Sequence, residues 1–242
     1  TPDVEPYSID EAFLEFKGIE NYDMQAYGET IQKRILKWTG IPTSVGIAPT
    51  KALSKVANKI ARKYPKETNN VFIIHTDEQR IKALKWTKIE SVWGIGRRLS
   101  KRLKSQGVKT AYDFSLLSDA WVLKNFSITE LNLKKDLEGK STLKLEDTTK
   151  SKKSIATTRS FESTYSDIDN IKERVSTFAM SCAEKLRRQK SSCNFIIVLL
   201  SSDRHKKDSE QHRESIHVPL PYPTDSSLII SNLIKKEICE TY

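Results

Sequence analysis

The sequence predicts a soluble, multidomain α+β protein, and three observations support this prediction. The chain has 242 residues, of which 30% are charged and 37% hydrophobic, as is typical of one to three globular domains. Its first third alternates short apolar runs with amphipathic helical patterns, and its last third does so again. The stretch between them has helical patterns only, so we expect a mixed region, a small all-helical region and a second mixed region.

The first expected element is a strand over about residues 7–17, which carries Asp10 and Glu11 in its interior. Burying an ionised carboxylate without a partner costs several kcal/mol, so an ordinary core strand does not carry such a pair. Mg²⁺ prefers oxygen ligands and takes one or two protein carboxylates together with substrate phosphates. Because consecutive strand residues point to opposite faces, both side chains serve one metal only if the chain bends there. A solvated strand end is the alternative.

The remainder of residues 1–76 is expected to contain two helices and two strands. In order, these are helix 24–39, strand 41–48, a helix from Pro49 and Thr50 to Tyr64, and strand 71–74. In the first helix, Ile31, Ile35 and Trp38 share one face, and Gly40 ends the helix. The alternation of strands and helices predicts a sheet with helices on one face.

The helix that follows Thr50 combines an apolar side with a basic stripe. The stripe consists of Lys51, Lys55, Lys59, Arg62 and Lys63. Residues 51–109 hold 16 Lys and Arg against 4 Asp and Glu, whereas residues 1–50 hold 4 against 8. A basic block beside an acidic one suits an enzyme that acts on a polyanion through metal ions. A merely solvated helix face is the alternative.

Residues 77–147 are expected to form a small helical region around a helix-hairpin-helix pattern. Its Gly94-Ile95-Gly96 turn opens a helix, so that backbone N–H groups can hold a DNA phosphate without reading sequence. Arg97, Arg98, Lys101 and Arg102 follow this turn. The later helices are expected to bury Leu116, Leu117, Trp121, Leu123, Phe126, Leu131, Leu133 and Leu137, and to end at Gly139.

Residues 148–153 are polar and are expected to form a linker to a two-layer α+β unit over residues 154–242. Its expected elements are strand 154–163, helix 168–189, strand 193–202, strand 212–220 and helix 225–239. The apolar run Cys193–Leu200 fits a central strand. A final strand after the second helix is expected, but the chain stops at Tyr242. Arg159 and Ser160 suit a phosphate contact, or else a solvent-exposed edge.

Three cysteines and four histidines show no metal-binding spacing. There is no signal-peptide pattern and no apolar run of membrane-spanning length, so we expect a cytoplasmic protein that does not enter a membrane.

Four motifs, in order, resemble the Y-family DNA polymerases that copy damaged templates, most closely the UmuC type. These motifs are Ser8-Ile9-Asp10-Glu11-Ala12-Phe13, Ser44-Val45-Gly46-Ile47-Ala48-Pro49-Thr50-Lys51, Val92-Trp93-Gly94-Ile95-Gly96-Arg97-Arg98, and Arg159-Ser160-Phe161 with Ala183-Glu184-Lys185-Leu186-Arg187. The resemblance implies a partial palm (1–76), a helix-hairpin-helix thumb (77–147) and a little finger (154–242). It implies error-prone, template-directed nucleotidyl transfer past damaged bases, within DNA repair and the SOS response.

The resemblance also implies roles for individual residues. Asp10 and Glu11 correspond to a metal-binding aspartate and its catalytic neighbour, in a reaction that uses two Mg²⁺ ions. Arg62 or Lys63 corresponds to a lysine that contacts the incoming dNTP, and Lys51 and Lys55 to further phosphate contacts. The residues expected to touch the DNA primer–template are Gly94, Gly96, Arg97, Arg98, Lys101, Arg159 and Ser160. The implied protein partners are a UmuD-like subunit, RecA and the sliding clamp.

The chain departs from the family pattern because the first metal-binding aspartate, the fingers and the last little-finger strand are missing. We therefore expect a fragment that binds DNA but is catalytically incomplete. The first rival is a non-catalytic helix-hairpin-helix DNA-binding module. The second is a helix-hairpin-helix glycosylase or nuclease, which needs a catalytic Asp or Lys just after the hairpin, where the stretch of residues 109–113 offers Asp113.

Overall fold

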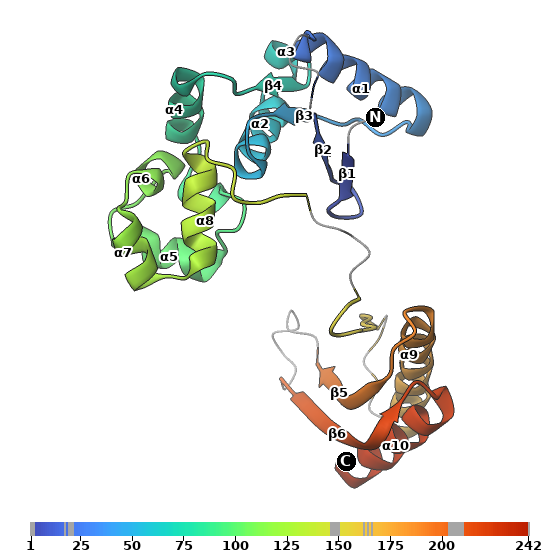
Figure 1. The fold of residues 1–242 in the computed structure, drawn as a ribbon. Coiled ribbons are helices and arrows are strands. Elements are labelled where there is room, and N and C mark those ends of the chain that lie inside the picture. Colours follow the sequence, from blue (N-terminus) through green and yellow to red (C-terminus); the bar gives the residue numbers. More distant parts are fainter. Residues whose placement is uncertain are drawn as a thin grey trace. The chain divides into compact units, whose positions relative to one another are not determined.

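The computed structural model describes residues 3–16, 18, 22–145, 151–161, 163, 165, 167–202 and 211–241. The chain divides into two compact units, Thr1–Thr148 and Thr149–Tyr242 (Figure 1). This division falls within the expected linker 148–153. The finer division of residues 1–147 into two domains remains a prediction.

The first unit begins with a β-hairpin rather than with one long strand. Strands β1 (Asp3–Pro6) and β2 (Ala12–Glu15) pair antiparallel. Between them, the backbone N–H groups of Tyr7 and Ser8 both donate to the carbonyl oxygen of Glu11, which closes a turn. The predicted strand over 7–17 is therefore wrong, and Asp10 and Glu11 lie in the turn. Ser8 and Asp10 favour this outcome because short polar side chains bond to nearby backbone and compete with strand pairing.

A second, parallel pair of strands lies between two helices. These elements are α1 (Met24–Thr39), β3 (Val45–Ile47), α2 (Lys51–Lys63), the single turn α3 (Pro65–Thr68) and β4 (Val71–Ile73). The bounds of α1 match the prediction, and Gly40 ends this helix in the left-handed conformation, with φ of +70°. Trp38, expected on the apolar face of α1, is instead 74% exposed.

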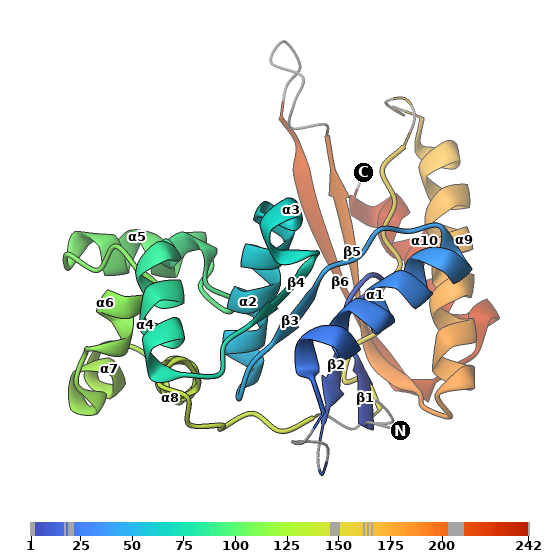
Figure 2. The ribbon, with the colours of Figure 1, turned by 90° about the horizontal axis from the view of Figure 1, so that it is seen from above.

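Helices α1 and α2 cover opposite faces of β3 and β4 (Figure 2). A Cβ atom placed on Gly28 of α1 would meet the side chains of Val71 and Ile47, whereas one on Gly46 would meet the backbone of Asn58 in α2. Because Gly46 and Ile47 are consecutive in β3, they point to opposite sides of the strand. The expectation of helices on one face is therefore wrong. Parallel strands are usually covered on both faces, as here.

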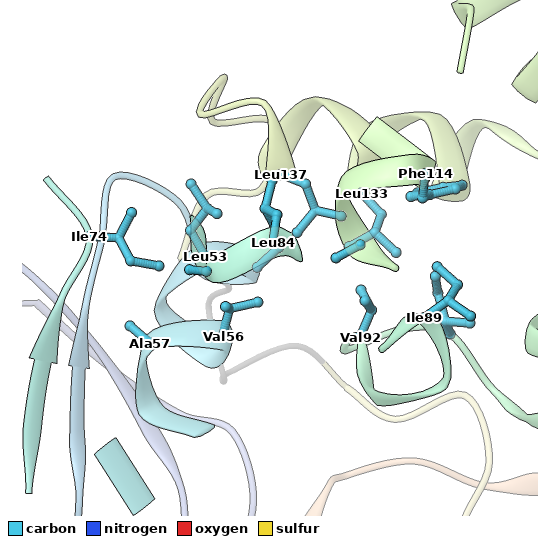
Figure 3. Close-up of a cluster of buried hydrophobic side chains, with 14 of the residues drawn as sticks. Leu53, Val56, Ala57, Ile74, Leu84, Ile89, Val92, Phe114, Leu133 and Leu137 are labelled. Carbon is cyan, nitrogen blue, oxygen red and sulfur yellow. The ribbon is translucent and has the colours of Figure 1, made fainter. Parts of the chain in front are cut away.

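The rest of the first unit is helical and shares its core with α2. Its elements are α4 (Asp77–Trp86), the 3-10 turn η1 (Ile89–Ser91), α5 (Arg97–Ser105), α6 (Ala111–Ser115), α7 (Asp119–Asn125) and α8 (Ile128–Leu137). Figure 3 shows buried side chains from these elements beside Leu53, Val56 and Ala57 of α2. Two predicted core residues, Leu116 and Leu123, are 67% and 48% exposed, so that part of the core prediction is wrong. This shared core fixes α2 relative to the helix-hairpin-helix segment.

In the second unit, two helices pack on an antiparallel pair of strands. The elements are α9 (Ile168–Arg188), β5 (Cys193–Ser201), β6 (Arg213–Thr224) and α10 (Ser227–Thr241). The buried apolar side chains of α9 and α10, among them Val175 and Ile234, meet Val198 of β5 and Val218 of β6. Most of the expected polar insert 201–211 lies outside the described residues.

Two strand predictions for this unit are wrong. Residues 154–161 form no strand and instead lie along α9, where Lys185 Nζ donates to the carbonyl oxygen of Ala156 at 2.9 Å. Strand β5 is not central within the described residues, because it pairs with β6 alone. One edge of β5 is therefore unpaired among the described residues. Separately, Phe195, Ile197 and Leu199 alternate along β5 on the face opposite Val198 and are 46%, 52% and 61% exposed.

Candidate functional site

The acidic centre of the candidate site is the turn between β1 and β2. Asp10 and Glu11 are both exposed there. Ser8 Oγ donates to Asp10 Oδ1 at 2.6 Å, and Glu11 Oε2 accepts from Lys55 Nζ at 2.7 Å. The bend that a shared metal site requires is therefore present. Among the described residues, the partner of the Asp10 carboxylate is the local hydroxyl of Ser8, whereas Glu11 has a cationic partner from α2.

Two lysines of α2 hold this hairpin. Lys51 Nζ lies 2.5 Å from Glu5 Oε2, and these two side chains are only 10% and 7% exposed. Lys51 also lies 5.0 Å from the ring centre of Phe13, and Lys55 lies 4.5 Å from that of Tyr7. A cation over an aromatic face is attracted by the ring as well as by a carboxylate. Both expected phosphate ligands are thus already engaged with the hairpin.

A small cavity opens beside Glu11. Its volume is about 230 Å³, and its lining residues are Glu11, Lys55, Val56, Asn58, Lys59, Arg62, Ser91 and Trp93. Burial and the nearby Arg62 guanidinium lower the pKa of Lys59 from its ordinary value. An ammonium group that is partly desolvated beside another cation gains from any anion that enters the cavity. The sequence placed Lys59 in the basic stripe of α2 but did not identify it as a residue of the site.

Arg62 and Lys63 point to different surroundings. Arg62 lines the cavity with Glu11. Lys63 Nζ instead lies 5.1 Å from the ring centre of Trp86 and 5.7 Å from that of Tyr64. Of the two alternatives that the sequence left open, Arg62 is therefore the one next to the acidic turn.

The helix-hairpin-helix segment forms a basic surface in the same unit. Gly94 has φ of +86°, a conformation that favours glycine, and Gly96 begins α5 without a side-chain cap. Arg97, Arg98 and Lys101 are exposed and form no ion pair within the described part of the chain. Arg102 instead lies 4.6 Å from the ring centre of Phe126.

Asp113 has a structural role at the start of α6. It accepts hydrogen bonds from the backbone N–H groups of Lys109 and Thr110, as the acidic member of a capping box. Burial tends to raise its pKa, but these hydrogen bonds outweigh burial and lower it. This arrangement disfavours the glycosylase or nuclease alternative, because the one candidate carboxylate is committed to a helix cap.

Arg159 and Ser160 belong to the second unit, whereas every other candidate residue belongs to the first. Both are exposed, and Arg159 Nη1 donates to the carbonyl oxygen of Thr158 at 3.2 Å. They are therefore accessible to a ligand within their own unit.

Asp10 and Glu11 fit part of a magnesium site. Among the described residues, no group of three or more His, Cys, Asp or Glu side chains is placed to hold a metal ion. Two exposed carboxylates in one turn do match the needs of Mg²⁺, which completes its shell with water and substrate phosphates. Separately, none of the described helices is long and apolar enough to cross a membrane.

The fold is that of the Y-family DNA polymerases. A solved Y-family DNA polymerase chimera, Dbh-Dpo4-Dbh, is similar with a TM-score of 0.69 and 20% identity, over 98% of this chain and 65% of the chimera. The insertion ternary complex of Dbh DNA polymerase gives a TM-score of 0.51 at 20% identity, over 96% of this chain and 64% of that one.

Sequence comparison then defines the family. Residues 1–59 match the impB/mucB/samB family, and residues 152–241 match the C-terminal domain of the same family. Protein UmuC of Salmonella typhimurium strain LT2 is 35% identical over 97% of this chain, and protein ImpB of Salmonella typhimurium is 31% identical over 94%. The chain belongs to the impB/mucB/samB family and is of the UmuC type. It spans 56% of UmuC and 54% of ImpB, about half the length of these relatives.

Proposed function

We propose that the chain is part of an error-prone translesion DNA polymerase, which transfers nucleotides from dNTPs to a primer past damaged template bases. The observation that carries the proposal is the cavity where Glu11 meets Lys55, Lys59 and Arg62. Polymerisation needs carboxylates for metal ions and cations for a triphosphate within one site. Similarity to UmuC, and to a DNA polymerase IV of Francisella tularensis subsp. holarctica that is 32% identical over 128 residues, supports the same function.

In this proposal Asp10 and Glu11 contribute carboxylates to a Mg²⁺ site that further ligands complete. When bound, two Mg²⁺ ions would stabilise the attacking 3′ oxygen and the leaving pyrophosphate. Arg62 and Lys59 attract the triphosphate from the cavity wall. Lys55 reaches a phosphate only by leaving Glu11, so its first role is to hold the turn, as Lys51 does through Glu5.

The DNA backbone is held by the helix-hairpin-helix segment. The backbone N–H groups at the start of α5 carry a partial positive charge. They can bind a DNA phosphate that lies against the Gly94–Gly96 turn. Arg97, Arg98 and Lys101 add exposed cations, and Arg159 and Ser160 add a contact from the second unit. In this proposal residues 1–76 form a partial palm, residues 77–147 the thumb and residues 154–242 the little finger.

The family resemblance also supports a cytoplasmic location and three protein partners, a UmuD-like subunit, RecA and the sliding clamp. The structure assigns no described residue to these partners.

DNA binding to a primer–template, measured by fluorescence anisotropy at several salt concentrations, tests the proposal. Each phosphate contact contributes about 0.9 to the slope of log K against log salt. Combined Arg97→Ala and Arg98→Ala substitutions should therefore lower the slope by about 2. Combined Lys37→Ala and Lys66→Ala substitutions remove two exposed cations elsewhere in the unit and should leave it unchanged. Equal effects of both pairs would refute the assigned surface.

Mg²⁺ binding distinguishes the proposed polymerase from the alternative, a non-catalytic DNA-binding module. Asp10→Asn should weaken Mg²⁺ binding, measured by titration calorimetry, without changing the fold. If Asp10→Asn leaves Mg²⁺ binding unaltered while DNA binding persists, the non-catalytic module is the better description.

A further inference from the structure

The turn that carries Asp10 and Glu11 needs support from outside its own hairpin. A two-stranded hairpin alone is at best marginally stable in water. At the tip of this one Ile9 is fully exposed, and the turn closes on itself through two backbone hydrogen bonds to Glu11. Its geometry therefore depends on the side chains that reach it from other elements.

One of these side chains comes from the helix-hairpin-helix segment. Trp93 Nε1 donates to Tyr7 Oη at 2.8 Å. The ring of Trp93 meets that of Tyr7 edge to face, with centres 5.7 Å apart, and lies 5.8 Å from that of Phe13. Trp93 thus contacts the residues on both sides of the acidic turn, although 86 positions separate it from Tyr7.

Residues next to Trp93 in the chain are buried in the core, and they hold its backbone in place. Val92 and Ile95 are 4% and 6% exposed and belong to the core of the unit, and the Ile95 N–H donates to the Val92 carbonyl. The next residue, Gly94, begins the loop to Arg97 and α5. Trp93 therefore links the acidic turn to the expected DNA-backbone loop through a segment that cannot shift without disturbing the core.

We propose that Trp93 is a positioning residue that fixes the Asp10–Glu11 turn to the loop of residues 94–98. A DNA backbone that orders this loop then also orders the carboxylate turn. This consequence rests on the proposed function, whereas the link itself does not. If Trp93 only packed in the core, its replacement would destabilise the whole unit. It would then have no specific effect on the turn, and loss of the hydrogen bond to Tyr7 would not matter.

The chain contains a matched control. Trp86 Nε1 donates to Tyr64 Oη at 3.1 Å, with ring centres 5.9 Å apart, in the same unit but away from the turn. Substitutions at Trp86 therefore remove the same kind of Trp–Tyr contact without touching Tyr7.

Hydrogen–deuterium exchange of the 242-residue chain without DNA tests the link. Trp93→Phe keeps a ring but removes the N–H donor, and should speed exchange of the Tyr7 and Ser8 amides about fivefold. Trp93→Ala also removes the ring contacts and should speed it about tenfold or more. Trp86→Phe and Trp86→Ala should leave these amides unchanged. Unchanged turn exchange in both Trp93 variants, or equal acceleration by the Trp86 variants, would overturn the proposal.

The same experiment with a primer–template duplex tests the consequence. In the wild type, DNA should slow exchange both at residues 94–100 and at the turn, whereas in Trp93→Phe it should slow only the former. Protection of the loop but not of the turn in the wild type would overturn the coupling. A lack of protection at residues 94–100 would count against the proposed function, and the DNA-free result would still decide the role of Trp93.

Discussion

Replacing Gly46 with alanine tests whether the close approach of β3 to α2 sets the stability of the first unit. The new Cβ would lie 2.1 Å from the Asn58 nitrogen and 2.3 Å from the Ser54 oxygen, whereas real Cβ contacts essentially never fall below 3.0 Å. The strand and helix must therefore separate by about 0.9 Å. Both obstructing atoms are backbone, so no side-chain rotation relieves the contact.

Overpacking usually costs about 1–3 kcal/mol, and we expect about 3 kcal/mol here because backbone must move. For a unit of roughly 150 residues, this lowers Tm by about 6–12 °C. The four tryptophans, Trp38, Trp86, Trp93 and Trp121, all lie in the first unit, so their fluorescence during denaturation reports that unit alone.

Gly96→Ala is the matched control. A Cβ at Gly96 meets nothing within 4 Å, and its φ of −77° suits alanine. We expect a loss of at most about 1 kcal/mol, as for an ordinary change at a helix start. If Gly46→Ala costs no more than Gly96→Ala, the close packing of β3 on α2 is not what holds these elements together.

Two further predictions concern charge. A double-mutant cycle of Glu5→Gln and Lys51→Met, followed by urea denaturation, should give a coupling of about 1–3 kcal/mol, because both side chains are nearly buried; a coupling near zero would mean that the pair does not hold the hairpin. The first unit should lose stability below about pH 4. Hydrogen bonds hold the pKa of the Asp113 carboxyl in the folded protein below its ordinary value, despite burial. The ionised Asp113 therefore contributes its full stabilisation above the ordinary pKa and loses it as the pH falls through the lowered, folded-state pKa. Asp113→Asn should flatten this acid dependence in urea denaturation between pH 3 and 7, and an unchanged pH profile would contradict the assignment.

The helices were the most predictable part of the fold. Helix α1 follows from Asp23, which caps its first turn, and from Gly40, which ends it. The predicted strand at 7–17 was wrong because local hydrogen bonds between Ser8 and Asp10 stabilise a turn within this stretch. The strand at 154–163 failed because polar contacts to α9 replace strand pairing over its described residues.

The candidate site was predictable in its residue types but not in its pairings. Motif spacing pointed to Asp10, Glu11 and the basic stripe of α2. It carried no information that Glu11 would meet Lys55, 44 positions away, or that Lys63 would turn toward Trp86. Such contacts depend on how the hairpin packs against α2, which local patterns do not determine.

The ion pairs that lysines of α2 form with the hairpin change the electrostatic interpretation of residues 51–109. Residues 51–109 carry a large excess of cations, yet two of these, Lys51 and Lys55, are used within the unit to hold the acidic hairpin. Among the cations that remain for a polyanion, Lys59 and Arg62 lie in the cavity wall, and Arg97, Arg98 and Lys101 lie on the exposed surface at the start of α5. These two groups flank Trp93, which lines the same cavity and directly precedes Gly94. A triphosphate beside Glu11 and a DNA backbone at Gly94–Gly96 would therefore bind on either side of Trp93, and loss of the Trp93–Tyr7 contact should uncouple the acidic turn from the DNA-backbone loop.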